Sequence, residues 1–136
     1  MTAKEYLSKI FYLDKEIEAK IKLADELRST ALKATTMSPD GVHTSTISDP
    51  TSDLAIKLDQ YSEEINHRVD ELVDLKRLVS KQIDQLDKWT HRMVLRERYI
   101  HLKKWEEIAV EQNYSYRQTT RLHGEALVEF DKIFEV

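Results

Sequence analysis

The chain has 136 residues and a formal net charge of -4 at pH 7, and it contains no cysteine, which excludes disulfides and thiolate chemistry. Charged residues make up 34% of it, with only 2 Gly and 2 Pro, a composition that favours long helices and predicts an all-α fold. It has no N-terminal apolar segment and no run of 18 apolar residues, so we expect a cytoplasmic protein without membrane association.

Two long amphipathic helices are predicted before residue 90, over residues 2–35 and 50–89, with residues 36–49 as the loop between them. The loop contains the turn signal Pro39-Asp40-Gly41. Asp49 is a good N-cap for the second helix, and Pro50 suits its first position. In the first helix, apolar residues recur at three- and four-residue steps: Tyr6, Ile10, Leu13, Ile17, Ile21, Ala24, Leu27 and Ala31.

The second helix carries a coiled-coil seam. One row repeats every seven residues, at Leu58, Ile65, Leu72, Val79, Leu86 and Met93, and a companion row lies four residues earlier, at Leu54, Tyr61, Arg68, Leu75, Gln82 and Trp89. The two helices either form an antiparallel hairpin or pair with a second chain. We expect residues 1–89 to be an association module that forms a homo-oligomer, with Arg68 and Gln82 setting its register. The alternative is a monomer whose seam packs on its own C-terminal domain.

Residues 90–136 are predicted to form a helix-turn-helix domain. The first helix contains residues 105–109 and stops at Asn113, since Asn tolerates a left-handed backbone. The second begins after Ser115, which forms a capping box with Gln118. Two short helices joined by so tight a turn are a common way to present a recognition helix to the DNA major groove, although an ordinary helical hairpin has the same local pattern.

Positive charge gathers in the same region. Residues 88–123 carry eight Lys and Arg against four Asp and Glu, whereas residues 1–87 carry twelve against seventeen. The cations therefore lie where the phosphates of double-stranded DNA would need them, although a basic face without a ligand is also a common outcome.

Four segments of this domain resemble region 4 of bacterial sigma factors: residues 94–100, residues 105–109, Ser115 and residues 121–127. The whole chain resembles the ArpU-type late-gene transcriptional regulators of phages and prophages, which join a helical N-terminal half to such a domain. The resemblance implies a regulator in a bacterial host cell that binds a promoter-proximal site and engages RNA polymerase. Thr119 departs from the pattern, because sigma factors usually carry a β-branched aliphatic residue inside the recognition helix.

The docking geometry of such motifs directs the first turns of the second helix to base edges. We therefore expect Tyr116, Arg117 and Thr120 to face the bases, and Arg117 or Arg121 to bind guanine. Gln118 either completes the capping box or binds adenine. His123 either contacts the rear of the helix or a phosphate. Three further cations are expected on phosphates: Arg96, Lys103 and Lys104.

Nothing in the chain predicts an enzyme, a metal site or a cofactor. The five histidines are scattered without metal-ligand spacing, and there is no Gly-rich phosphate loop and no nucleophile motif. Besides the regulator, two other interpretations of the chain's function remain open. One is a DNA-packaging adaptor of the small-terminase type, and the other is a protein-interaction module that contacts polymerase without binding DNA.

Overall fold

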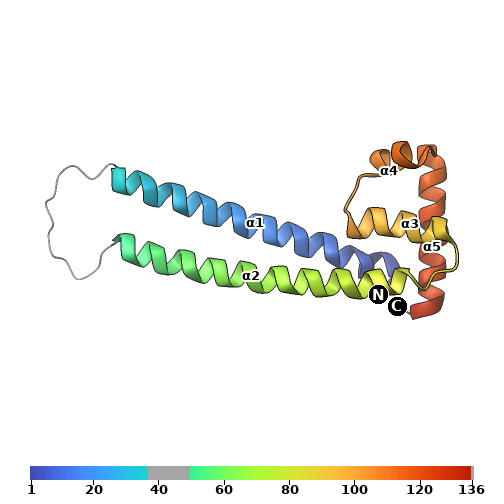
Figure 1. Cartoon of the computed structure of the whole chain (residues 1–136), viewed down its shortest axis with the longest axis horizontal. Helices are drawn as coiled ribbons and strands as arrows, with labels where there is room; N and C mark the ends of the chain where they lie inside the picture. The colour runs from blue at the N-terminus through green and yellow to red at the C-terminus, as the bar shows by residue number, and fades with distance from the viewer. Residues whose placement is uncertain (37–49, 136) are drawn as a thin grey trace, which may run out of the picture. The chain divides into compact units, whose positions relative to one another are not determined.

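The computed structural model describes residues 1–36 and 50–135, which are helical with no strand among them, so the predicted all-α class is confirmed (Figure 1). The helices are α1 (Ala3–Thr36), α2 (Pro50–Ile83), α3 (Trp89–Leu95), α4 (Trp105–Gln112) and α5 (Tyr116–Phe134). A π-helical turn, η1 (Arg96–Ile100), continues α3. None of the described helices has an apolar stretch long enough to cross a membrane.

The long helices begin at local signals. α2 starts at Pro50, as predicted, whereas Asp49 and the turn at Pro39-Asp40-Gly41 lie outside the described residues. At the start of α1, the Thr2 hydroxyl accepts the backbone N–H of Glu5, and the Glu5 carboxylate accepts that of Thr2. This capping box, which the sequence analysis missed, holds the first turn of α1 in place.

The prediction that the second helix runs to residue 89 is wrong. α2 ends at Ile83, and residues 84–88 lead to α3. The guanidinium of Arg92 donates hydrogen bonds to the carbonyl oxygens of Leu86 and Asp87, which the break leaves without helical partners. The sevenfold repeat does not reveal the break, because Leu86 within it is buried, as are Val79 before it and Met93 after it. Trp89, expected in the seam, is 58% exposed.

The described residues form two compact units, and the division lies inside both long helices. The first unit contains residues 1–14 and 72–136, so the boundary expected at residues 89–90 falls within it. In this unit α5 packs against both α3 and α4 (Figure 1). Its fully buried apolar side chains come from every helix of the unit: Leu7, Ile10, Val79, Ile83, Val94, Leu95, Ile108, Ala126 and Phe130.

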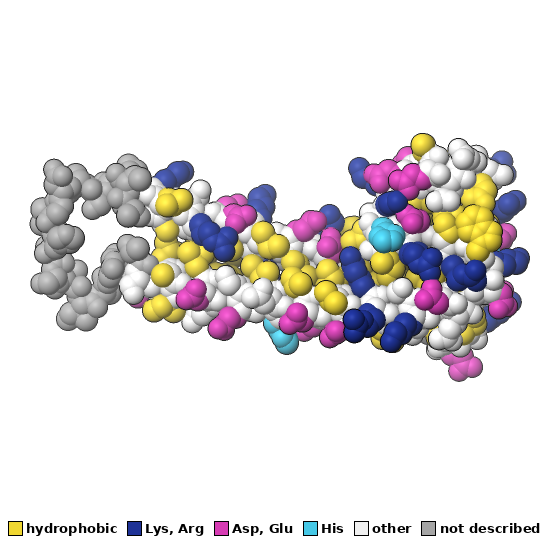
Figure 2. Space-filling model, in the orientation of Figure 1, with side chains coloured by type: hydrophobic (Ala, Val, Ile, Leu, Met, Phe, Trp, Pro, Cys, Tyr) yellow, Lys and Arg dark blue, Asp and Glu magenta, His cyan; other side chains and the backbone are white. Residues whose placement is uncertain are grey.

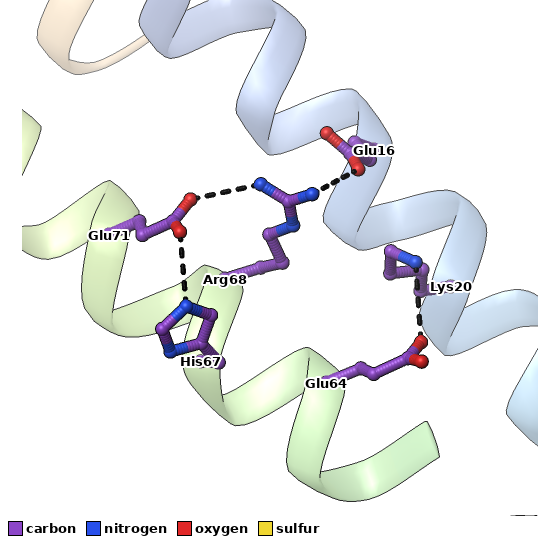
Figure 3. Close-up of polar contacts among 6 residues, drawn as sticks. All are labelled: Glu16, Lys20, Glu64, His67, Arg68 and Glu71. Carbon is purple, nitrogen blue, oxygen red and sulfur yellow. Dashed lines mark hydrogen bonds and ion pairs between the residues drawn. The ribbon is translucent and has the colours of Figure 1, made fainter. Parts of the chain in front are cut away.

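The second unit, residues 15–71, holds an antiparallel pair of helical segments from α1 and α2. Figure 3 shows Arg68 of α2 lying between Glu71, 3.1 Å away on its own helix, and Glu16 of α1, at 3.4 Å. Lys20 and Glu64 form a second pair between the segments, at 3.5 Å. Arg68 therefore forms ion pairs that link two helices of one chain. We had expected it instead to fix the register between helices of different chains.

The predicted apolar row of α2 is buried in the first unit and half-buried in the second. In the first unit Leu72, Val79, Leu86 and Met93 are buried, and Gln82 accepts a hydrogen bond from the Tyr6 hydroxyl at 2.7 Å. In the second unit Leu58 and Ile65 are only half-buried. The predicted apolar row of α1 is less accurate: Ala3 and Leu7 are buried although neither was expected, and Ile21 is exposed.

Candidate functional site

α4 and α5 are joined by a three-residue turn, residues 113–115. Its first residue, Asn113, has the left-handed backbone that the sequence predicts. Asn113 ends α4 with φ 60° and ψ 35°, in the left-handed region, which confirms the sequence prediction. The backbone N–H of Tyr114 donates to the carbonyl oxygen of Ala109 at 3.0 Å. The N–H of Asn113 donates to the same carbonyl, and these two bonds close the C-terminal end of α4.

The predicted capping box at the start of α5 is also confirmed. The Ser115 hydroxyl accepts the N–H of Gln118 at 3.0 Å, and the Gln118 side-chain oxygen accepts the N–H of Ser115 at 2.9 Å. Of the two roles open to Gln118, its side chain takes the capping role in this structure. The first turn of α5 is therefore fixed by its own side chains, and its outer face stays exposed.

The inner face of α5 is anchored in the core of the first unit. Thr119 is 1% exposed, and its hydroxyl donates to the carbonyl oxygen of Ser115 at 2.9 Å. A polar side chain is therefore tolerated at this buried position, because its hydroxyl has a hydrogen-bond partner. Ala126 and Phe130 continue the buried face, and the ring centroid of Phe130 lies 6.0 Å from that of Tyr6 in α1.

The expected base-reading residues lie together on the first turns of α5. Tyr116, Arg117, Gln118 and Arg121 are exposed, and Thr120 is half-buried. Ser115, Arg117, Gln118, Thr120 and Arg121 line a shallow hollow of about 600 Å³. This surface has the exposure and the donors that a groove-reading helix needs.

The expected phosphate-binding cations differ in their availability. Lys103 lies 2.6 Å from Glu97 and 2.7 Å from Glu111, and the hydrogen bonds to Glu111 and Glu97 raise its pKa. Arg96 pairs with Asp84 at 2.6 Å. Both charges are thus compensated within the chain. Arg121 has a looser contact, 3.8 Å, with Glu125, whereas Arg117 and Lys104 have no carboxylate partner among the described residues.

His123 faces the interior of this unit. Its ring centroid is 4.4 Å from that of Trp105, and its Nε2 lies 2.6 Å from the Tyr99 hydroxyl. Burial, with the positive charges of Lys4 and Arg98, lowers the pKa of His123 to about 4, and burial raises the pKa of Tyr99 to about 12. At neutral pH the imidazole of His123 is therefore neutral, and it shares one hydrogen bond with the Tyr99 hydroxyl.

Within residues 1–36 and 50–135 no group of three or more His, Asp or Glu side chains could hold a metal ion. Comparison with protein-family models, with curated proteins and with solved structures finds no match for this chain.

Proposed function

We propose that this chain is a DNA-binding transcriptional regulator of the phage or prophage type, which reads a promoter-proximal site through a helix-turn-helix formed by α4 and α5. The proposal rests on the way in which the first two turns of α5 are held and exposed. They are held by a complete capping box, anchored through Thr119, and left with Arg117 and Arg121 exposed. A rigid helix that presents arginine in this way suits recognition of guanine O6 and N7.

Charge supports the same function. In Figure 2, Lys and Arg side chains gather over the part of the first unit where the ends of α1 and α2 meet α5. Arg117 and Lys104 carry charges without a carboxylate partner among the described residues, so neither must break an ion pair to bind a phosphate or a base. Uncompensated cations attract DNA because their binding releases its condensed counterions.

The outer face of α4 supports a second contact, with a protein. Glu106, Glu107, Val110 and Glu111 are exposed on it, and Val110 is 78% exposed. Carboxylates repel phosphates, so this face suits a protein surface rather than DNA. We propose RNA polymerase as that partner, in line with the resemblance to sigma region 4.

The test is DNA binding at 50–300 mM salt, with a duplex selected from a random pool compared with unselected duplex. We expect the parent to prefer the selected duplex and Arg117→Ala to weaken that binding by roughly 5–150-fold, since a bidentate base contact contributes about 1–3 kcal/mol. Arg77→Ala is the matched control, because it removes the same charge from an exposed position on α2.

If Arg117→Ala and Arg121→Ala both bind like the parent at every salt concentration, the assignment of α5 as the reading helix is wrong. Absence of any salt-sensitive affinity would favour the protein-interaction module, and the α4 face would then be the surface to map. Unselective binding by a ring of many copies would favour the packaging adaptor.

A further inference from the structure

A small cavity of about 160 Å³ lies beside α5, on the side that faces the first turns of α1. Lys4 and Ser8 of α1, Arg98 of η1 and Thr120 of α5 contribute to its wall. All four residues belong to the first unit. Sites for drug-sized ligands enclose about 300–1,000 Å³, so this cavity has room for one compact group and not for a nucleoside.

The wall of the cavity is positive and uncompensated. Lys4 and Arg98 line it, no carboxylate does, and neither cation pairs with a carboxylate among the described residues. Arg98 is held in place, because its guanidinium lies 4.6 Å from the Trp105 ring centroid and donates to the carbonyl oxygen of Lys103 at 2.9 Å. A guanidinium has five N–H donors, so others remain for a ligand.

Hydroxyl groups complement the two cations. The side chains of Ser8 and Thr120 line the same cavity, and Thr120 already donates its own proton to the carbonyl oxygen of Arg117 at 3.0 Å. The neutral ring of His123 and the Tyr99 phenol also line it, and they satisfy each other at 2.6 Å. The donors that the cavity offers to a ligand are therefore the two cations and the Ser8 hydroxyl, beside three aromatic side chains and no carboxylate.

We infer that this cavity binds a single phosphate-type oxyanion between Lys4 and Arg98. Arginine and lysine bind phosphate through short, charge-assisted hydrogen bonds, and a phosphate group fits a compact cavity. Two sources share this chemistry, a free phosphate and a phosphodiester of bound DNA. Thr120 lines both this cavity and the hollow formed by Arg117 and Arg121, which places a backbone phosphate next to the reading face. That second source rests on the proposed function.

Trp105 lines the cavity, so its fluorescence reports occupancy directly. The chain has 2 Trp, and the exposed Trp89 is replaced by Phe in all variants to leave Trp105 as the only reporter. Inorganic phosphate is titrated at constant ionic strength, with chloride making up the difference. We expect a saturable change that Lys4→Gln weakens at least tenfold. Lys9→Gln is the control, because Lys9 is on the same helix and its Nζ lies over the Tyr6 ring instead.

A parallel titration uses the full chain with duplex DNA across the salt range. If a backbone phosphate occupies the cavity, Lys4→Gln lowers the slope of log affinity against log salt by about 1, and Lys9→Gln leaves it unchanged. A phosphate response that depends on Lys4, without a change in this slope, identifies a free phosphate as the ligand. If Lys4→Gln matches Lys9→Gln in both titrations, the inference is wrong. The phosphate titration needs no DNA, so it stays informative even if the chain binds none.

Discussion

His123 is the residue whose protonation couples most directly to folding. Its pKa falls from the ordinary 6.5 to about 4 because the ring is buried beside Trp105, near Lys4 and Arg98. The unfolded chain therefore binds a proton at this side chain below pH 6.5, where the folded chain does not. The free energy of unfolding then decreases as the pH falls from 6.5 to about 4, and it is at its full value above pH 6.5.

We expect the parent to lose about 1 kcal/mol of stability at this residue between pH 7 and pH 5, after allowance for solvent around an incompletely buried ring. Urea denaturation at the two pH values measures it. His123→Gln keeps an acceptor for Tyr99 and removes the titration, so its stability should change less over this range. His101→Gln serves as the control, since His101 is exposed. Equal pH dependence in His123→Gln and the parent would contradict the assignment.

Residue-scale features were predictable where their cause is local. Asn113 and the pair of Ser115 and Gln118 act on their own backbone within three residues, so the sequence pattern alone locates them. Lys4 and Arg98 are separated by most of the chain, and no pattern in the sequence shows that they line one cavity. The ion pairs of Lys103 were hidden in the same way, because Glu97 and Glu111 belong to η1 and α4.

At the scale of elements, the periodicity of α2 predicted which face is buried but not where the helix ends. The heptad row continues across residues 84–88 because the turn keeps Leu86 and Met93 in one core. What ends the helix is a set of contacts made from beyond the break: Arg92 to the carbonyls of Leu86 and Asp87, and Arg96 to Asp84. Such contacts have no signature in hydrophobic spacing, so a continuous helix was the natural prediction.

Arg92→Ala should therefore destabilise the first unit by about 1–3 kcal/mol, because two carbonyl oxygens lose a charged donor. Chemical denaturation gives the free energy, and Arg77→Ala is again the matched control, with an expected change within about 0.5 kcal/mol at an exposed position. Arg92→Lys should recover part of the loss, since an ammonium donates to carbonyls without the planar fork. If Arg92→Ala were as stable as Arg77→Ala, the turn would be held by other contacts.

At the scale of the whole molecule, the second unit buries few apolar side chains. Ile17 and Ala24 are the apolar side chains that are buried among the described residues between 15 and 71. Ile21 is 42% exposed and Ile56 54% exposed in the same unit. Two helices that bury so little apolar surface are marginal in water, because packing supplies most helical stability. This is the physical argument for the expectation that the long helices associate with a second copy of the chain.

If chains associate through this unit, the measured mass should be at least twice that of one chain. The melting temperature should also rise with protein concentration. Ile56→Glu places a charge on the exposed apolar surface of α2, so it should shift the chain towards a single copy and lower the concentration dependence. Asn66→Asp adds the same charge at an exposed polar position of α2 that is not on the helix face of Ile56, and it should change neither. Sedimentation equilibrium of the parent and both variants distinguishes the cases. A single-chain mass for the parent at all concentrations would instead support the monomer, with the stability of residues 15–71 then dependent on contacts within one chain.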